Sequence, residues 1–196
     1  MILLLVLSSF IFQSAQQPVP GYLAMPSTPP RALLLYFHRY TEKGDAVGNW
    51  DAITARGYAV TGFTNFPVNN VIPMANDEIA SLRDKGMQST PVVAMGASMG
   101  SLYAARWFAS NPKVRALILI VPGSEDICES MKRAAGRPVF LIQADQDDTT
   151  FGSGAKIRQC LQGKQYMVKG ASHNFSPDAI VGVISDWLDS LPLANQ

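Results

Sequence analysis

The residues best suited to chemistry form the segment GASMG, from Gly96 to Gly100, at the end of an apolar run. Glycines two residues on either side of Ser98 permit a sharp turn from a strand into a helix. Such a turn projects the serine hydroxyl, and the helix that follows aims its free N–H groups at the same place. Ser98 is therefore a candidate nucleophile, although a glycine-rich turn without a catalytic role can give the same pattern.

A serine hydroxyl becomes a good nucleophile when a neighbouring base takes its proton. The chain has two histidines, His38 and His173, and only His173 follows Ser98. Sites built on this kind of turn place the serine first, the acid second and the histidine last. We therefore predict His173 as the base. We expect His38 to make hydrogen bonds within its own loop.

The third component is a carboxylate that accepts a hydrogen bond from the histidine and stabilises its charged form. It should follow the strand predicted at 138–144, where the sequence reads DQDD from Asp145 to Asp148. We favour Asp147, which lies three residues past the end of that strand. The alternatives are Asp148 and Asp145 and, after the preceding strand, Glu125 and Asp126.

Attack on a carbonyl group creates negative charge on its oxygen, which two preset N–H donors can stabilise. The backbone N–H of Met99, directly after the candidate nucleophile, is the first predicted donor. The second should come from the loop that begins at His38, where we favour the backbone N–H of Tyr40 over that of Arg39.

These residues need a scaffold of strands and helices, and the apolar pattern predicts one. Continuous apolar runs, typical of strands buried on both faces of a parallel sheet, occur at 32–37, 58–63, 91–97, 114–121, 138–144 and 165–168. Segments with helical spacing lie between and after them, at 45–56, 76–85, 99–110, 154–161 and 177–191. The segment 124–136 is expected to hold only a short helix. The alternation predicts an α/β fold with about six mostly parallel strands, helices on both faces and no large lid.

Composition narrows the class of protein further. The chain has 196 residues, of which 47% are hydrophobic and 16% charged, and this suits one compact domain, which we place at 18–196. The net charge is +1 and no basic run occurs, so we expect no nucleic-acid partner. No phosphate-binding loop and no cluster of histidines and carboxylates is present, so we expect no metal, nucleotide or flavin cofactor. A monomer is favoured.

The first 17 residues resemble a secretory signal peptide. The apolar run from Met1 to Phe12 is too short to span a bilayer as a helix. Cleavage is predicted after Ala15, which would give a secreted or periplasmic protein without a stable membrane anchor. The alternative is a buried N-terminal helix or strand.

The two cysteines, Cys128 and Cys160, form an even set in a chain predicted to be exported. We predict that they form a disulfide, with two unpaired buried thiols as the alternative. The bridge would connect the loop after one strand to the helix after the next.

The stretch from Gly21 to Leu191 resembles a small α/β-hydrolase, close to the dienelactone-hydrolase-like enzymes and to bacterial cutinase-like polyester hydrolases. The segments that carry the resemblance are 21–26 (GYLAMP), 40–41 (YT), 96–100 (GASMG), 144–147 (ADQD) and 170–173 (GASH). The resemblance implies a triad of Ser98, Asp147 and His173, with Tyr40 and Met99 as oxyanion donors. It implies hydrolysis of small or polymeric carboxylic esters through an acyl-enzyme.

The sequence also departs from these relatives. Dienelactone hydrolases have cysteine where Ser98 stands. The polyester hydrolases have an aromatic substrate clamp where this chain reads VPGSED at 121–126. This chain is also shorter than both groups, and we expect it to lack their first strands. The alternative functions are a peptidase or amidase that uses the same triad, or a non-catalytic binding protein on a hydrolase scaffold.

Overall fold

An eight-stranded sheet forms the centre of the computed structural model, which describes residues 10–13, 18–38, 50–63, 70–176 and 178–193. The strands are β1 (Phe10–Gln13), β2 (Pro18–Ala24), β3 (Ala32–Phe37), β4 (Tyr58–Phe63), β5 (Val92–Ala97), β6 (Val114–Ile120), β7 (Val139–Ala144) and β8 (Lys164–Val168). Their order across the sheet is β1-β2-β4-β3-β5-β6-β7-β8. The pairs β1–β2 and β2–β4 are antiparallel, and all the other pairs are parallel.

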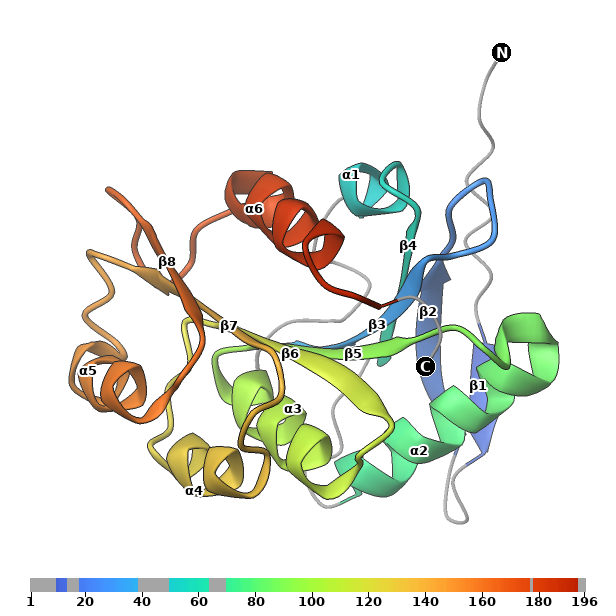
Figure 1. Ribbon diagram of the computed structural model, residues 1–196, viewed down its shortest axis with the longest axis horizontal. Helices are drawn as coiled ribbons and strands as arrows, with labels where there is room; N and C mark the ends of the chain where they lie inside the picture. The colour runs from blue at the N-terminus through green and yellow to red at the C-terminus, as the bar shows by residue number, and fades with distance from the viewer. Residues whose placement is uncertain (1–9, 14–17, 39–49, 64–69, 177, 194–196) are drawn as a thin grey trace.

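Helices cover both faces of this sheet (Figure 1). One face carries α1 (Asp51–Thr54) and α6 (Asp178–Asp189). The other carries α2 (Val71–Leu82) with its continuation η2 (Arg83–Met87), α3 (Met99–Ser110), α4 (Asp126–Arg133) and α5 (Phe151–Cys160). The α/β class and the two-sided arrangement predicted from the sequence are therefore confirmed.

Alternate residues of the central strands supply the two apolar layers. On β3, Leu33, Leu35 and Phe37 pack in the layer under α2 and α3, whereas Leu34 and Tyr36 pack in the layer under α6. All six residues of β3 are buried, as are those of β4, β5 and β7. Burial on both faces explains why these strands appear in the sequence as continuous apolar runs and not as alternating patterns.

The six predicted strands are present as β3 to β8, but the sheet extends beyond them. The expectation that the chain lacks the first strands was wrong, because β2 and β1 add two antiparallel strands beside β4. Proline is a poor residue for an interior strand, so Pro18 and Pro20 concealed β2 in the sequence. Both prolines lie outside the stretch Gly21–Ala24 that pairs with β4.

The predicted signal peptide overlaps β1. We expected the first 17 residues to lie outside the fold, yet Phe10–Gln13 pairs with β2, from Phe10 opposite Gly21 to Gln13 opposite Pro18. In the uncleaved chain this segment is thus an edge strand. The other residues of the segment, 1–9 and 14–17, lie outside the described part of the chain, and cleavage remains a prediction.

The predicted helices all have counterparts. The segment predicted at 45–56 is helical from Asp51 to Thr54, and its residues 45–49 lie outside the described residues. The short helix expected at 124–136 is α4. None of the helices in the described ranges is long and apolar enough to cross a membrane.

The predicted disulfide between Cys128 and Cys160 is present, with the two Cα atoms 5.7 Å apart. It joins α4 to the last residue of α5. An ion pair between Lys156 of α5 and Glu125, the residue before α4, also connects these two helices, with the closest atoms 2.8 Å apart.

Arg137 closes the C-terminal end of α3. Its guanidinium donates to the backbone carbonyls of Phe108 at 2.6 Å and Asn111 at 3.0 Å, and also to that of Val114. The guanidinium carbon lies 3.7 Å from the centre of the Phe108 ring. Arg137 thus satisfies a carbonyl in the last turn of α3, where the helix leaves carbonyls without partners, and ties it to Asn111 after the helix and to Val114 at the start of β6.

Glu78 of α2 is a carboxyl group buried in the apolar layer, with none of its surface exposed. The hydroxyl of Thr61, on β4, lies 2.5 Å from Glu78 Oε1 and 3.0 Å from the backbone carbonyl of Tyr22 on β2. Glu78 Oε2 is buried without a hydrogen-bond partner. Burial raises the pKa of Glu78 to about 7, although the Thr61 hydrogen bond and the charge of Lys85 act in the opposite direction.

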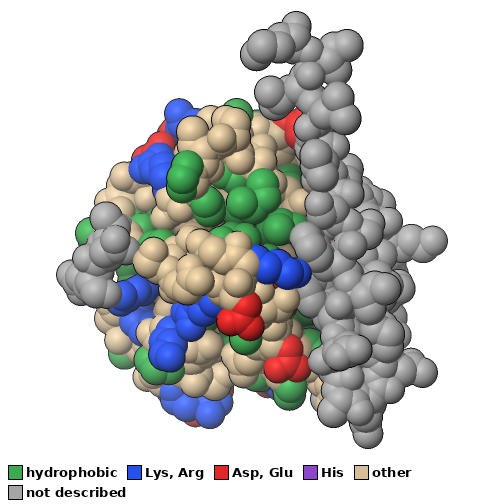
Figure 2. Space-filling model, turned by 90° about the vertical axis from the view of Figure 1, so that its right-hand side faces the viewer, with side chains coloured by type: hydrophobic (Ala, Val, Ile, Leu, Met, Phe, Trp, Pro, Cys, Tyr) green, Lys and Arg blue, Asp and Glu red, His purple; other side chains and the backbone are tan. Residues whose placement is uncertain are grey.

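Charges on the face at the β1–β2 end are mixed. On its described part, Lys and Arg side chains form small groups among apolar and uncharged residues, with Asp and Glu between them (Figure 2). This agrees with the nearly balanced counts of 16 basic and 15 acidic residues.

Candidate active site

Ser98 lies in the turn between β5 and α3, in a backbone conformation that few residues adopt. Its φ of 51° and ψ of −120° place it in a region disfavoured for residues with a Cβ. Its backbone N–H donates to the carbonyl of Ile120 at 2.9 Å, which anchors the turn to the neighbouring strand. This is the strained turn that the GASMG segment predicts.

The two glycines of the segment are required by close backbone contacts. A Cβ on Gly96 would lie 2.5 Å from the carbonyl oxygen of Gly100. A Cβ on Gly100 would lie 2.0 Å from the carbonyl oxygen of Phe37 and 2.5 Å from that of His38. All three distances are far below van der Waals contact, so only glycine fits at these two positions unless the backbone moves. The turn is thereby packed tightly against the end of β3.

The structure brings Ser98, His173 and Asp147 into one hydrogen-bonded chain. His173 Nε2 lies 2.9 Å from Ser98 Oγ, and His173 Nδ1 lies 2.9 Å from Asp147 Oδ2. The three residues follow β5, β7 and β8, whose carboxyl ends meet at the same edge of the parallel sheet. A hydroxyl, an imidazole and a carboxylate in this order can transfer a proton from the hydroxyl while the carboxylate stabilises the imidazolium.

Asp147 is the carboxylate held in place, with only 4% of its surface exposed. Its Oδ1 accepts the backbone N–H groups of Thr149 at 3.0 Å and Thr150 at 3.1 Å. Its Oδ2 accepts the Thr150 hydroxyl at 2.5 Å in addition to His173. Burial raises the pKa of Asp147, but the hydrogen bonds from Thr150 and His173 outweigh burial and hold the pKa below its usual value.

The alternative carboxylates do not occupy this position. Asp145 and Asp148, on either side of the same turn, are exposed. Glu125 and Asp126 lie at the start of α4, where they pair with Lys156 and Arg106. Thr150, whose hydroxyl binds the carboxylate, was missed from the sequence, because a threonine three residues after an aspartate is a common turn pattern.

Of the two predicted oxyanion donors, the structure describes one. Met99 is the first residue of α3, so its N–H belongs to the helix start, where amides have no partner within the helix. The side chain of Met99 is 46% exposed. Tyr40 and its alternative Arg39 lie outside the described residues. His38 is buried, and its carbonyl faces Gly100.

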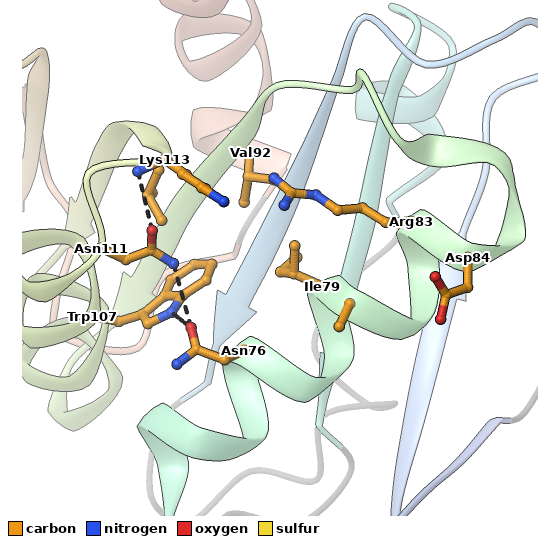
Figure 3. A pocket seen from close by; sticks show the side chains of 10 residues that line it. Asn76, Ile79, Arg83, Asp84, Val92, Trp107, Asn111 and Lys113 are labelled. Carbon is orange, nitrogen blue, oxygen red and sulfur yellow. Dashed lines mark hydrogen bonds between the residues drawn. The ribbon is translucent and has the colours of Figure 1, made fainter.

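A cavity of about 420 Å³ lies at the opposite ends of the strands and contains none of these residues. It is bordered by the start of β5, the end of α3 and the α2–η2 segment (Figure 3). In its wall, Asn76 Oδ1 accepts hydrogen bonds from Trp107 at 2.8 Å and Asn111 at 3.3 Å. Within the described ranges, no group of three or more His, Cys, Asp or Glu side chains is arranged to hold a metal ion.

The sheet order, the two-sided helix cover and the strained serine turn together define the α/β-hydrolase fold. A predicted CIB-like hydrolase from Thermoplasma acidophilum superposes with a TM-score of 0.75 at 17% identity, covering 95% of this chain and 100% of that one. The dienelactone hydrolase from Anabaena variabilis superposes with a TM-score of 0.72 at 17% identity, covering 93% and 97%. The esterase domain of a Rhodothermus marinus protein gives 0.71 at 16% identity, covering 92% and 97%.

At these identities the likeness establishes the fold. No protein-family model matches the sequence, and no curated protein matches it either. The function of this protein therefore has to be inferred from the residues of the site and not from sequence relatives.

Proposed function

We propose that this protein is a serine hydrolase that cleaves carboxylic esters through an acyl-enzyme intermediate. The observation that carries the proposal is the chain of two 2.9 Å contacts from Ser98 through His173 to Asp147. The strained turn at Ser98 supports it, because strain is retained where the surrounding structure requires it and such residues cluster at active sites. The similarity in fold to an esterase domain and to a dienelactone hydrolase agrees with ester chemistry.

In the first step, Ser98 Oγ attacks the ester carbonyl carbon as its proton passes to His173 Nε2. Asp147 accepts the Nδ1–H of the imidazolium and stabilises its charge. The backbone N–H groups of Met99 and Tyr40 are the proposed donors to the carbonyl oxygen, which becomes negative. The tetrahedral intermediate then expels the alcohol, which takes the proton from His173 Nε2.

In the second step, a water molecule attacks the acyl-enzyme. His173 takes one proton from the water as the new C–O bond forms, and the tetrahedral intermediate expels Ser98 Oγ, which regains that proton. The products are the carboxylic acid and the free serine. No cofactor takes part in this proposed cycle.

Export is the second part of the proposal. The apolar N-terminal segment resembles a signal peptide, and the disulfide between Cys128 and Cys160 suits an oxidising compartment. The proposed substrates are accordingly small or polymeric esters outside the cytoplasm.

The test compares the wild type with Ser98→Ala, using a fluorophosphonate probe and a panel of soluble esters with matched amides. Ser98→Ala is expected to lose labelling and at least about 10³-fold in kcat/KM. Ser89→Ala, an exposed serine at the opposite ends of the strands, is the control and should behave as the wild type. Near-normal turnover by folded Ser98→Ala would refute the proposed nucleophile. Faster turnover of the amides would favour a peptidase or amidase, and a wild type that neither reacts with the probe nor turns over any substrate would favour a non-catalytic protein.

A further inference from the structure

Thr150 contacts the carboxylate of Asp147 on the same oxygen that binds the histidine. The Thr150 hydroxyl lies 2.5 Å from Asp147 Oδ2, and His173 Nδ1 lies 2.9 Å from that atom. Only 8% of the Thr150 surface is exposed, so water does not readily replace the hydroxyl at this position. Two hydrogen-bond donors thus share one carboxylate oxygen inside the protein.

The hydroxyl of Thr150 is directed to Asp147 and not to a helix-capping bond. Thr150 directly precedes α5, at the position where threonine oxygens commonly accept a backbone N–H. Here the side chain makes no capping hydrogen bond. Its methyl group lies close to Gly123, because a Cβ on that glycine would be 3.2 Å from Thr150 Cγ2. The hydroxyl of Thr150 therefore contacts Asp147 while its methyl group lies near Gly123. Together these contacts restrict rotation of the hydroxyl away from Asp147.

We propose that Thr150 is a positioning residue of the candidate site, whose hydroxyl withdraws negative charge from Asp147 Oδ2 and thereby sets the pH above which His173 accepts the Ser98 proton. The inference rests on the proposed function, since it assigns Thr150 a role in the same proton transfer. Thr150 does not touch the substrate in this proposal and acts only through Asp147.

The direction of the effect follows from electrostatics. A hydrogen bond donated to a carboxylate oxygen disperses its negative charge, so the neighbouring imidazolium is stabilised less. Without the Thr150 hydroxyl, Oδ2 carries more negative charge and holds the protonated form of His173 up to a higher pH. As pH is raised, His173 then loses its proton, and can accept the proton of Ser98, only at a higher pH than in the wild type.

Other charged groups around this turn are unaltered by changes at Thr150 and are screened by water. Among the described residues they include Asp145 and Asp148 in the turn itself, and Glu125 and Asp126 with their partners Lys156 and Arg106 around α4 and α5, all exposed at the surface. The Thr150 hydrogen bond is also a leading reason that the pKa of Asp147 is held low against burial, which agrees with withdrawal of charge.

The main variant is Thr150→Val, which keeps the shape of the side chain and removes the hydroxyl. Thr150→Ser keeps the hydroxyl without the methyl group, and Thr149→Val makes the same change at an exposed neighbour. The pH dependence of kcat/KM on a soluble ester is the first measurement. The second is a proton NMR titration of the His173 ring, assigned with His38→Gln because the chain has only two histidines.

In Thr150→Val the acidic limb of kcat/KM should move to higher pH by about half a pH unit, and the His173 ring should titrate in step. Thr150→Ser and Thr149→Val should keep the wild-type limb. An unmoved limb and ring titration in Thr150→Val would overturn the proposal, even if activity falls. Should Thr150→Val not fold, Thr150→Ser against Thr150→Ala provides the same comparison. If the wild type hydrolyses no ester, the proposed function is refuted. The NMR titration of the His173 ring still tests whether Thr150 affects His173.

Discussion

Replacing Glu78 by glutamine should remove a pH-dependent loss of stability. The single hydrogen of the Thr61 hydroxyl can reach either the Tyr22 carbonyl, 3.0 Å away, or Glu78 Oε1, 2.5 Å away. Both contacts become hydrogen bonds when Glu78 carries a proton and donates it to Thr61 Oγ1. Glutamine reproduces that protonated form, because its amide N–H can donate to the same oxygen.

The magnitude follows from the raised pKa of Glu78, which goes from 4.5 to about 7 on folding because the group is buried. The folded state therefore holds the proton more tightly than the unfolded state. Between these two pH values the unfolded state loses the proton first, so the wild type becomes less stable as pH rises. The loss is complete above about pH 7 and amounts to about 3 kcal/mol relative to a neutral side chain.

The assay is urea unfolding of the wild type and Glu78→Gln at pH 4.5 and pH 8. The stability of Glu78→Gln relative to the wild type should increase by about 3 kcal/mol between the two pH values, with unchanged dependence on urea. Asp77→Asn, at an exposed carboxylate on the same helix, is the matched control and should show no such increase. A difference between Glu78→Gln and the wild type that stays constant with pH would refute the reasoning.

Two further predictions concern stability. Arg137→Met should lower the free energy of unfolding by about 2 kcal/mol or more, because three backbone carbonyls lose a charged donor, whereas the exposed Arg133→Met should change it little. Equal urea midpoints for these two variants would contradict the role of Arg137 at the end of α3. Replacing Cys128 and Cys160 together by alanine should cost about 3–4 kcal/mol, since the bridge closes a loop with a sequence separation of 32. An unchanged urea midpoint under oxidising conditions would count against a stabilising bridge.

Much of the candidate site could be predicted because the order of residues restricts it. Only one histidine follows Ser98 in the chain. The strained turn at Ser98 requires a glycine two residues before it and another two residues after it. The choice among Asp145, Asp147 and Asp148 rested on the usual length of the turn, and the structure holds Asp147 through two backbone N–H groups. These two hydrogen bonds depend on the backbone conformation of the turn. The presence of three aspartates among four residues does not by itself show which of them the turn will hold.

Other features could not be predicted because local sequence conflicts with their surroundings. The helix predicted from residue 76 begins at Val71, because Asn76 and Asp77, which are residue types common at a helix start, lie inside it. A glutamate in a helix is usually exposed. Glu78 is buried because α2 packs this side chain against the β2–β4 pair. The contact of Thr150 with Asp147 is a tertiary feature of one turn. The predicted position of Tyr40 lies outside the described residues and remains a prediction.

The strand β2 would have a further consequence if the proposed signal peptide is cleaved. Cleavage after Ala15 would remove β1, so β2 would become the outer edge of the sheet. An uncovered edge strand attracts strands from other molecules, and natural proteins protect such edges with residues that cannot pair. Pro18 and Pro20, which β1 faces in the uncleaved chain, have no N–H to donate. The mature protein would thus carry its own barrier to edge-to-edge aggregation in the residues that remain after the leader is removed.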